Sequence, residues 1–177
     1  MIRSDASGED GWGACLGGYH FIGPWPVGLQ DQHMLFKEMV PVTIVLALAA
    51  PALQETVFGV AVDNTGVAFA LNKLECRDQD TLRLLQQITS DLGKYGHTGL
   101  GAHVRRHRNT HTDAMSHTLP KVWWKKIVRE QSRRSKKFKK GYWFFPFVVQ
   151  CLESGTCLSG VFRMRQSLFA SLADKHI

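Results

Sequence analysis

Four acidic residues stand where predicted strands and helices could bring them together. Asp5 ends the first predicted strand, and Asp63 ends an apolar strand over 57–63. Glu38 begins the first long helix, and Asp113 lies in the last one. A site in an open α/β sheet forms outside the carboxyl ends of neighbouring strands. Carboxylates that meet there repel one another unless divalent cations neutralise them, and such oxygen ligands select Mg²⁺ or Mn²⁺. The spacing therefore raises the hypothesis of a two-ion site that clamps a phosphoryl group.

Each acid also has an ordinary structural explanation. Asp63, Asn64 or Thr65 can accept a hydrogen bond from the first turn of the helix that follows, and capping is the commoner role of such residues. On spacing alone, each of the other acids is more often a cap or a solvated surface charge. The metal hypothesis therefore depends on whether the four acids converge.

The elements that must position the acids begin with strands and a long helix. Apolar runs split by glycine over 1–26 predict an antiparallel meander. A long apolar helix follows. Because Pro41 fits only the first helical turn, the regular helix is expected to begin near Lys37 or Glu38.

The second half of this region alternates strands with helices. After the strand over 57–63 we expect a short helix from Thr65, a strand from Thr98 and a helix from Asn109. The clearest amphipathic helix starts at Asp78 and is expected to end at Gly93 or Gly96, with apolar residues three or four apart at Leu82, Leu85, Ile88 and Leu92. This order predicts an α/β fold. Its mixed sheet joins antiparallel hairpin strands to parallel crossover strands, with helices on both faces.

Composition narrows the class of protein. The chain has 177 residues, of which 44% are hydrophobic and 21% charged, enough for one domain with a core and an appendage. Four cysteines without a C-x-x-C pair indicate neither a disulfide framework nor a cysteine zinc site. The apolar run from Met39 is shorter than the roughly 18 residues of a membrane span, and no signal peptide is visible. We expect an intracellular protein, nuclear or cytoplasmic, without a membrane partner.

Charge is distributed unevenly along the chain. Residues 1–102 carry 6 Lys/Arg against 11 Asp/Glu, whereas residues 103–177 carry 16 against 4. Lys121–Lys140 alone holds ten of these cations with one Glu, which suggests either a polyanionic partner or a solvated tail. We place a boundary near 119–121. It separates a domain over 1–119 from a basic, aromatic-rich tail over 120–177 that could form a helix pair or no stable fold.

The ordered motifs SDAS…GWGA, KEMVPV…LAL, AVDNTGVAFALNK and AHVRRHRNTHTDAMSH resemble the ribonuclease H domain of reverse-transcribing elements. A turn at Gly23-Pro24-Trp25-Pro26 adds to the likeness, which covers about 1–119 and is greatest to DIRS-type, tyrosine-recombinase retrotransposons. The resemblance implies an RNase H-like fold with a five-stranded mixed sheet. It also implies an endonuclease that cuts the RNA strand of RNA–DNA hybrids with two Mg²⁺ or Mn²⁺ ions, downstream of a reverse transcriptase in a parent polyprotein.

The resemblance assigns roles to matching positions. The family's metal-binding acids match Asp5, Glu38, Asp63 and Asp113, and Asp5 would bridge both ions. His103 matches a loop histidine that assists proton transfer or product release, although an ordinary strand-end histidine explains it equally well. Candidate nucleic-acid contacts are Ser7, Asn64, Arg105, Arg106, Asn109 and Ser116. For the serines and asparagines among them, capping or turn roles are the commoner alternative.

Departures from the family pattern keep other functions open. The usual Pro-Gly after the histidine is Arg105-Arg106, the usual Ala before the last acid is Thr112, and the closing Arg is His117. One alternative is a catalytically inactive, nucleic-acid-binding remnant that keeps the acids without their geometry.

A second alternative is a histidine zinc site. It would use the four histidines that follow the last predicted strand, His103, His107, His111 and His117. Four-residue spacing places histidines on one face of a helix, but this helix is expected to start only near Asn109, and no cysteine lies close in sequence.

Overall fold

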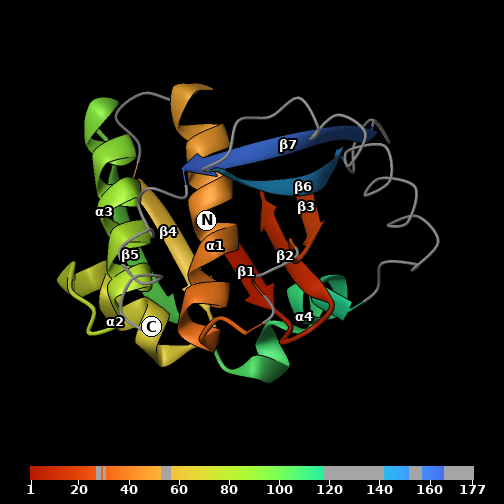
Figure 1. Ribbon diagram of the computed structural model, residues 1–177, viewed down its shortest axis with the longest axis horizontal. Helices are drawn as coiled ribbons and strands as arrows, with labels where there is room; N and C mark the ends of the chain where they lie inside the picture. Colours follow the sequence, from red (N-terminus) through yellow and green to blue (C-terminus); the bar gives the residue numbers. More distant parts are fainter. Residues whose placement is uncertain (27–28, 30, 53–56, 118–141, 152–156, 166–177) are drawn as a thin grey trace, which may run out of the picture.

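The described strands form one sheet with helices packed on both faces (Figure 1). The computed structural model describes residues 1–26, 29, 31–52, 57–117, 142–151 and 157–165, and for the last two ranges only the backbone. The strand order is β5-β4-β1-β2-β3-β6-β7. The first five strands in this order come from residues 1–119, so the predicted α/β fold with a five-stranded mixed sheet is confirmed for that region.

The N-terminal strands form the predicted meander of β1 (Ile2–Ala6), β2 (Gly11–Leu16) and β3 (Tyr19–Pro24). β2 runs antiparallel to both neighbours. Gly17 starts the two-residue loop between β2 and β3 at φ 58°, the left-handed region that the first position of such a hairpin loop needs and that glycine adopts without strain.

Two parallel strands extend the sheet on the other side of β1. β4 (Val57–Val62) lies parallel to β1, and β5 (Thr98–His103) lies parallel to β4. The predicted pairing of the strand that ends at Asp63 with the strand that carries Asp5 is therefore confirmed. The carboxyl ends of β1, β4 and β5 meet at one edge of the sheet, which is where a ligand site is expected.

Three helices cover one face of the sheet and one helix covers the other. α1 (Met34–Ala49), α2 (Thr65–Lys73) and α3 (Gln79–Lys94) lie on the first face, and the 3₁₀ turn η1 (Ala50–Ala52) continues α1. α4 (Thr110–His117), preceded by the 3₁₀ turn η2 (Arg106–Arg108), packs on the opposite face over β1 and β2.

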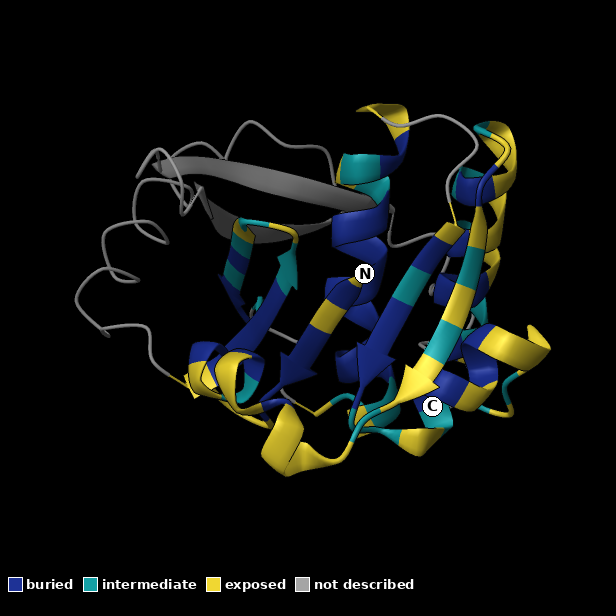
Figure 2. Cartoon of the chain, turned by 180° about the vertical axis from the view of Figure 1, so that it is seen from behind, coloured by how far each residue is buried: buried dark blue, intermediate teal, exposed yellow. Residues whose placement is uncertain are grey.

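The main core lies between the sheet and its three-helix face. The inward side chains of β1, β2 and β4 pack there against α1 and α3, and these strands are buried while β5 at the sheet edge is largely exposed (Figure 2). The largest fully buried side chains include Trp12, Phe36 and Phe58. Close contact on the other face depends on Gly13, where a Cβ would come within 2.6 Å of Met115 Cβ of α4.

α1 starts earlier than the sequence predicts. The helix begins at Met34, with His33 Nδ1 accepting a hydrogen bond from the Leu35 N–H, so Pro41 lies inside the helix and not in its first turn. Pro41 has no N–H to donate to the carbonyl four residues earlier. Since the side chains of 36–46 are all buried, tertiary packing offsets this local cost.

The helical segment Met34–Ala52 is 19 residues long and apolar enough, by length and composition, to cross a membrane. It exceeds the apolar run judged from the sequence because it starts at Met34 and continues through η1. Of its most apolar 18-residue window, 67% is buried inside the fold, where α1 packs against the sheet and α3. Burial to this extent is typical of a core helix.

The C-terminal region adds two strands that sequence reasoning did not predict. β6 (Tyr142–Cys151) pairs antiparallel with β3, and β7 (Cys157–Arg165) pairs antiparallel with β6. Of the two alternatives left open for the tail, a helix pair is therefore wrong for these two ranges. The proposed boundary near 119–121 and the basic segment Lys121–Lys140 lie outside the described residues.

Candidate metal centre

Three carboxylates converge where β1 and β4 end. Asp5 lies in β1, Asp63 directly follows β4, and Glu38 projects from α1; one oxygen of each lies within 4.8 Å of the others. Asp5 and Glu38 are buried and Asp63 is partly buried. Within the described ranges, no other group of three or more His, Cys, Asp or Glu residues comes this close. The structure thus brings together three of the four acids that the sequence singled out.

Burial makes two of these carboxylates hard to ionise. Burial, opposed by a hydrogen bond from Ser116 and reinforced by Asp63, raises the pKa of Asp5 to about 6. Burial, reinforced by Asp5 and Asp63, raises the pKa of Glu38 to about 9. At neutral pH the metal-free protein therefore carries a proton on Glu38.

The donor set fits a hard divalent cation. Glu38 Oε2 is buried and has no hydrogen-bond partner, which costs free energy unless a ligand compensates. The three side chains offer only carboxylate oxygens, the ligands that Mg²⁺ and Mn²⁺ prefer over softer metals. Asp5, Glu38 and Asp63 are therefore the residues that could hold such an ion.

The fourth predicted acid, Asp113, lies beside this group but does not belong to it. Asp113 Oδ1 accepts hydrogen bonds from Arg106 Nη2 at 2.9 Å and Nε at 3.3 Å. Its charge still contributes to the raised pKa of Asp5. A guanidinium thus stands beside the carboxylates, at a position where the resembling family has Pro-Gly.

Ser116 links α4 directly to the carboxylates. Its Oγ donates to Asp5 Oδ2 at 2.8 Å, and the same hydroxyl lies 2.9 Å from the Asp113 carbonyl. Ser116 is buried, so this hydrogen bond can fix the orientation of the Asp5 carboxylate. The sequence offered one signal for this role, since Ser116 stands three residues after Asp113 and such residues share a helix face.

Lys37 is a residue near the site that sequence reasoning missed. It is buried, its Nζ donates to the Gly8 carbonyl at 2.6 Å, and it lies 5.9 Å from the centre of the Trp25 ring. Trp25 Nε1 in turn donates to the Ser7 carbonyl at 2.8 Å. These contacts hold the loop after Asp5 against the first turns of the helix that carries Glu38.

Most candidate nucleic-acid contacts have structural partners. Ser7 Oγ accepts from the N–H groups of Asp10 and Gly11, and Asn64 Oδ1 caps α2 by accepting from the N–H groups of its first turn. Asn109 is buried and its Nδ2 donates to the Ser4 carbonyl at 3.0 Å, so it anchors the chain before α4 to β1. The turn and capping explanations therefore account for Ser7 and Asn64.

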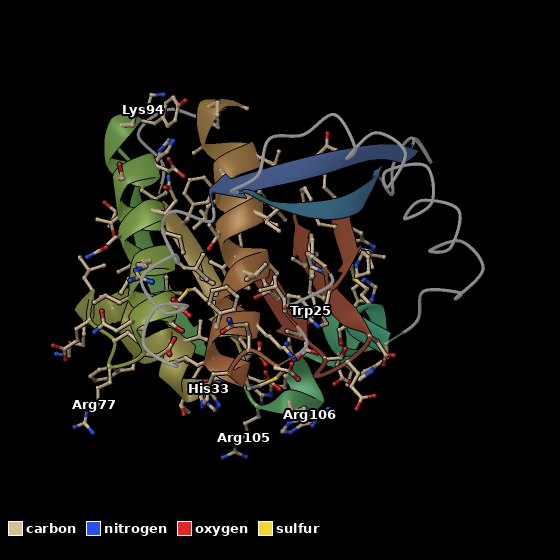
Figure 3. All side chains as sticks on the ribbon, in the orientation of Figure 1. Trp25, His33, Arg77, Lys94, Arg105 and Arg106 are labelled. Carbon is tan, nitrogen blue, oxygen red and sulfur yellow. The ribbon has the colours of Figure 1, made fainter. Side chains whose placement is uncertain are left out.

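Exposed basic side chains lie at the same end of the molecule as the carboxylates. Arg77, Arg105 and Arg106 point outward there, whereas Lys94 marks the opposite end (Figure 3). His103 is exposed at the end of β5, where its backbone pairs with Val62, the residue before Asp63. The arrangement puts cations and one histidine within the surroundings of the acidic group.

The four-histidine zinc site that the sequence left open as an alternative is wrong. His111 lies against His20, with 3.1 Å between their Nε2 atoms, and His117 Nδ1 lies 3.1 Å from Asp10 Oδ2. In the part of the chain that the structure describes, no three of His103, His107, His111 and His117 come within reach of one ion.

Replacing Ser116 with alanine tests whether its hydrogen bond to Asp5 supports metal binding. Ser116→Ala removes the donor to Asp5, and outer partners of a metal ligand typically contribute about 10- to 100-fold to metal affinity or activity. We expect a loss of Mg²⁺ affinity in this range by isothermal titration calorimetry. Ser4→Ala is the matched control, because Ser4 is buried in β1, next to Asp5, and its Oγ has no hydrogen-bond partner. Equal affinities for Ser116→Ala and Ser4→Ala would show that this hydrogen bond does not support the site.

Comparisons with known proteins give a distant likeness. No protein-family model matches the chain, and no curated protein matches it in sequence. The solved structures that are similar to it include two RNase H proteins. The N-terminal RNase H domain of a Mycobacterium tuberculosis protein, solved as a fusion with maltose-binding protein, is 16% identical with a TM-score of 0.46. RNase H1 from the halophilic archaeon Halobacterium salinarum is 17% identical with a TM-score of 0.45. Each likeness covers 64% of this chain and 91% of the other. At these scores no residue role can be carried across, so the site is assigned from the geometry of this chain.

Proposed function

We propose that the chain is an RNase H-type endonuclease that hydrolyses the RNA strand of RNA–DNA hybrids with Mg²⁺ or Mn²⁺. The observation that carries this proposal is the convergence of Asp5, Glu38 and Asp63 at the carboxyl ends of β1 and β4. Buried carboxylates with raised pKa values are costly in a protein that binds nothing there. A bound cation would offset this free-energy cost by neutralising the carboxylates.

Each side chain has a distinct task in this proposal. Asp5, Glu38 and Asp63 hold the metal, and Ser116 orients Asp5. Two divalent ions, when bound, would supply charge to stabilise the attacking and leaving oxygens of an in-line displacement. Asp113 and His103 complete the surroundings, the first as a further carboxylate and the second as a group that could carry a proton.

Substrate recognition is proposed to rest on the nucleic-acid backbone. Arg105 and Arg106 are exposed at the same end of the molecule as the carboxylates, and the charge of Arg106 acts on Asp5. Both side chains can attract a phosphate toward an acidic group that would otherwise repel it. RNA-containing duplexes are recognised mainly by shape, phosphates and 2′-hydroxyls. We further propose that the domain works inside the cell as part of a retroelement polyprotein with an upstream reverse transcriptase, which sequencing of the upstream reading frame would test.

The second candidate function is a nucleic-acid-binding remnant without catalysis. Its supporting observation is that one of the four acids, Asp113, forms an ion pair with Arg106 and is not part of the three-carboxylate group. A remnant of this kind would bind hybrids but would not cleave them.

One assay separates these two functions. The purified chain is incubated with an RNA–DNA hybrid labelled on the RNA strand, with Mg²⁺ or with EDTA, and products are resolved by length. We expect Mg²⁺-dependent cuts in the RNA strand and none in an all-DNA duplex of the same sequence. Binding to the hybrid without cleavage in either Mg²⁺ or Mn²⁺ would favour the remnant.

The basic segment Lys121–Lys140 is proposed to strengthen binding to phosphates. Replacing its ten Lys/Arg by Gln should weaken hybrid binding and make its salt dependence shallower, because fewer counterions are released. Substitution is a cleaner test than deletion of 121–177, because β6 in that region pairs with β3. The measurement is the hybrid dissociation constant over a salt series, with Mg²⁺ affinity as the control that stays unchanged. An unchanged salt slope would assign the segment no role in binding.

A further inference from the structure

Two histidines from different elements meet on the α4 face of the sheet, apart from the three-carboxylate group. His20 in β3 and His111 in α4 have their Nε2 atoms 3.1 Å apart. Their ring centroids are 4.5 Å apart and their planes are tilted by 58°. If the two Nε2 atoms pointed straight at each other, the distance between the ring centroids would equal the Nε2–Nε2 distance plus two ring radii. The observed centroid distance is shorter than that sum. The in-plane direction of at least one Nε2 therefore does not point at the other Nε2.

This separation is close to that of two ligands on one metal ion. Two nitrogens bound to a tetrahedral zinc ion at about 2.0–2.1 Å lie roughly 3.3–3.4 Å apart. To reach it, the rings of His111, which is exposed, and of His20, which is partly exposed, would have to rotate.

A thiol lies next to the pair. Cys15 in β2 is directly opposite His20 in the antiparallel pairing of β2 with β3, so the two side chains stand on the same face of the sheet. Cys15 is a free, partly buried cysteine. Its sulfur is not yet within reach of both nitrogens, because the described residues hold no three-ligand group that includes it. Rotation about its Cα–Cβ bond is the movement that would recruit it.

We propose that His20 and His111 form a binding site for a borderline-soft divalent transition-metal ion, with Zn²⁺ as the representative and Cys15 as the third ligand. Imidazoles and a thiolate bind such ions in preference to Mg²⁺, whereas the three-carboxylate group suits Mg²⁺. The two sites are therefore chemically distinct, and this one does not depend on the proposed nuclease function.

A metal at this position would fasten α4 to the sheet. His111 belongs to the same helix as Ser116, which donates to Asp5. A bridge from α4 to β3 would restrict the helix that orients the candidate metal ligand. Zinc bound here would thus stabilise the folded protein and leave the carboxylates free.

The test is a zinc titration of the metal-depleted chain followed by NMR of the imidazole nitrogens. We expect ZnCl₂ to shift the ring signals of His20 and His111, each assigned by its His→Gln variant. His20→Gln and His111→Gln should each lower zinc affinity by about tenfold or more, since the loss of a direct ligand costs at least as much as the loss of an outer partner. His117→Gln is the matched control, because His117 lies in the same helix but contacts Asp10.

Two further measurements fix the third ligand and separate the two sites. Co²⁺ in place of Zn²⁺ should give a thiolate-to-metal charge-transfer band that Cys15→Ser removes. Asp63→Asn should leave the zinc response of His20 and His111 unchanged, whatever it does to catalysis. Ring signals that do not respond to zinc, or respond equally in His111→Gln and His117→Gln, would overturn the proposal and leave a metal-free hydrogen-bonded pair. A zinc response without the cobalt band would overturn the role of Cys15.

Discussion

Replacing Asp63 with asparagine is expected to abolish most Mg²⁺-dependent cleavage of an RNA–DNA hybrid. The loss should exceed the roughly 10- to 100-fold that removal of an outer partner of a metal ligand costs, because Asp63 would contact the metal itself. The fold should persist, because asparagine has nearly the same shape as aspartate and position 63 is partly exposed. One negative charge beside Asp5 and Glu38 is removed, so the metal-free protein should be as stable as before or slightly more stable.

The matched control for this substitution is Asp91→Asn. Asp91 lies in α3, one turn before Lys94, which marks the end of the molecule opposite Arg106 (Figure 3). Its carboxylate accepts a hydrogen bond from Gln87 and is no part of the acidic group. Cleavage rates under single-turnover conditions, with circular dichroism as the check of folding, compare the two variants. A folded Asp63→Asn protein that cleaves at the wild-type rate would rule out the proposed metal centre.

Strand ends and hydrophobic periodicity were enough to predict most of the fold of residues 1–119. The continuous apolar run before Asp63 reflects a strand that is buried on both faces at its carboxyl end. The three- and four-residue spacing of apolar side chains in α3 reflects burial of one helix face. The start of α1 was predicted too late because Pro41 was weighed by local rules alone. The buried surface of α1 overrides those rules, and burial against other elements is not visible in one segment.

The β6–β7 pair shows a different limit. Its sequence is rich in aromatic and β-branched residues, but it lacks the alternation that identifies a strand with one exposed face. Whether such a run becomes a strand depends on an available sheet edge, here β3. Pairing of this kind joins residues more than a hundred positions apart and cannot be read from local composition.

The candidate site also has parts that the sequence predicts and parts that depend on tertiary packing. Asp5 and Asp63 could be predicted to meet because strand ends in an α/β sheet gather at one edge. The partners of those acids could not, because the contacts of Ser116 with Asp5 and of Arg106 with Asp113 depend on how α4 docks. Residue types that suit a site are visible in sequence, whereas the hydrogen bonds that orient them arise from tertiary packing.

Replacing Glu38 with glutamine is expected to stabilise the metal-free protein at neutral and alkaline pH. Burial raises the pKa of Glu38 to about 9 in the folded protein, whereas an unfolded glutamate ionises near its ordinary value. Between these two values the folded state binds more protons than the unfolded state, so stability falls as pH rises. Glutamine cannot ionise and escapes this cost, which amounts to roughly 3 kcal/mol at pH 7.

The pH dependence distinguishes this effect from a change in packing. Denaturant unfolding of both proteins in EDTA should give equal stabilities near pH 4.5 and a gap that widens steadily up to about pH 9. Asp5 contributes a similar fall at lower pH, ending near its folded pKa of about 6, in both proteins. A gap that is constant across this range would mean that Glu38 is not held protonated.

Metal binding should reverse the sign of the Glu38 effect. Glu38 must lose its proton to act as a ligand, so binding of Mg²⁺ at pH 7 is expected to release protons from the wild-type chain. Calorimetric titrations in two buffers with different ionisation enthalpies measure that release. Glu38→Gln should release fewer protons and bind Mg²⁺ more weakly, so added Mg²⁺ stabilises the wild type more than the variant. If Mg²⁺ bound both proteins equally and released no protons from either, Glu38 would be a buried neutral acid with no part in the metal centre.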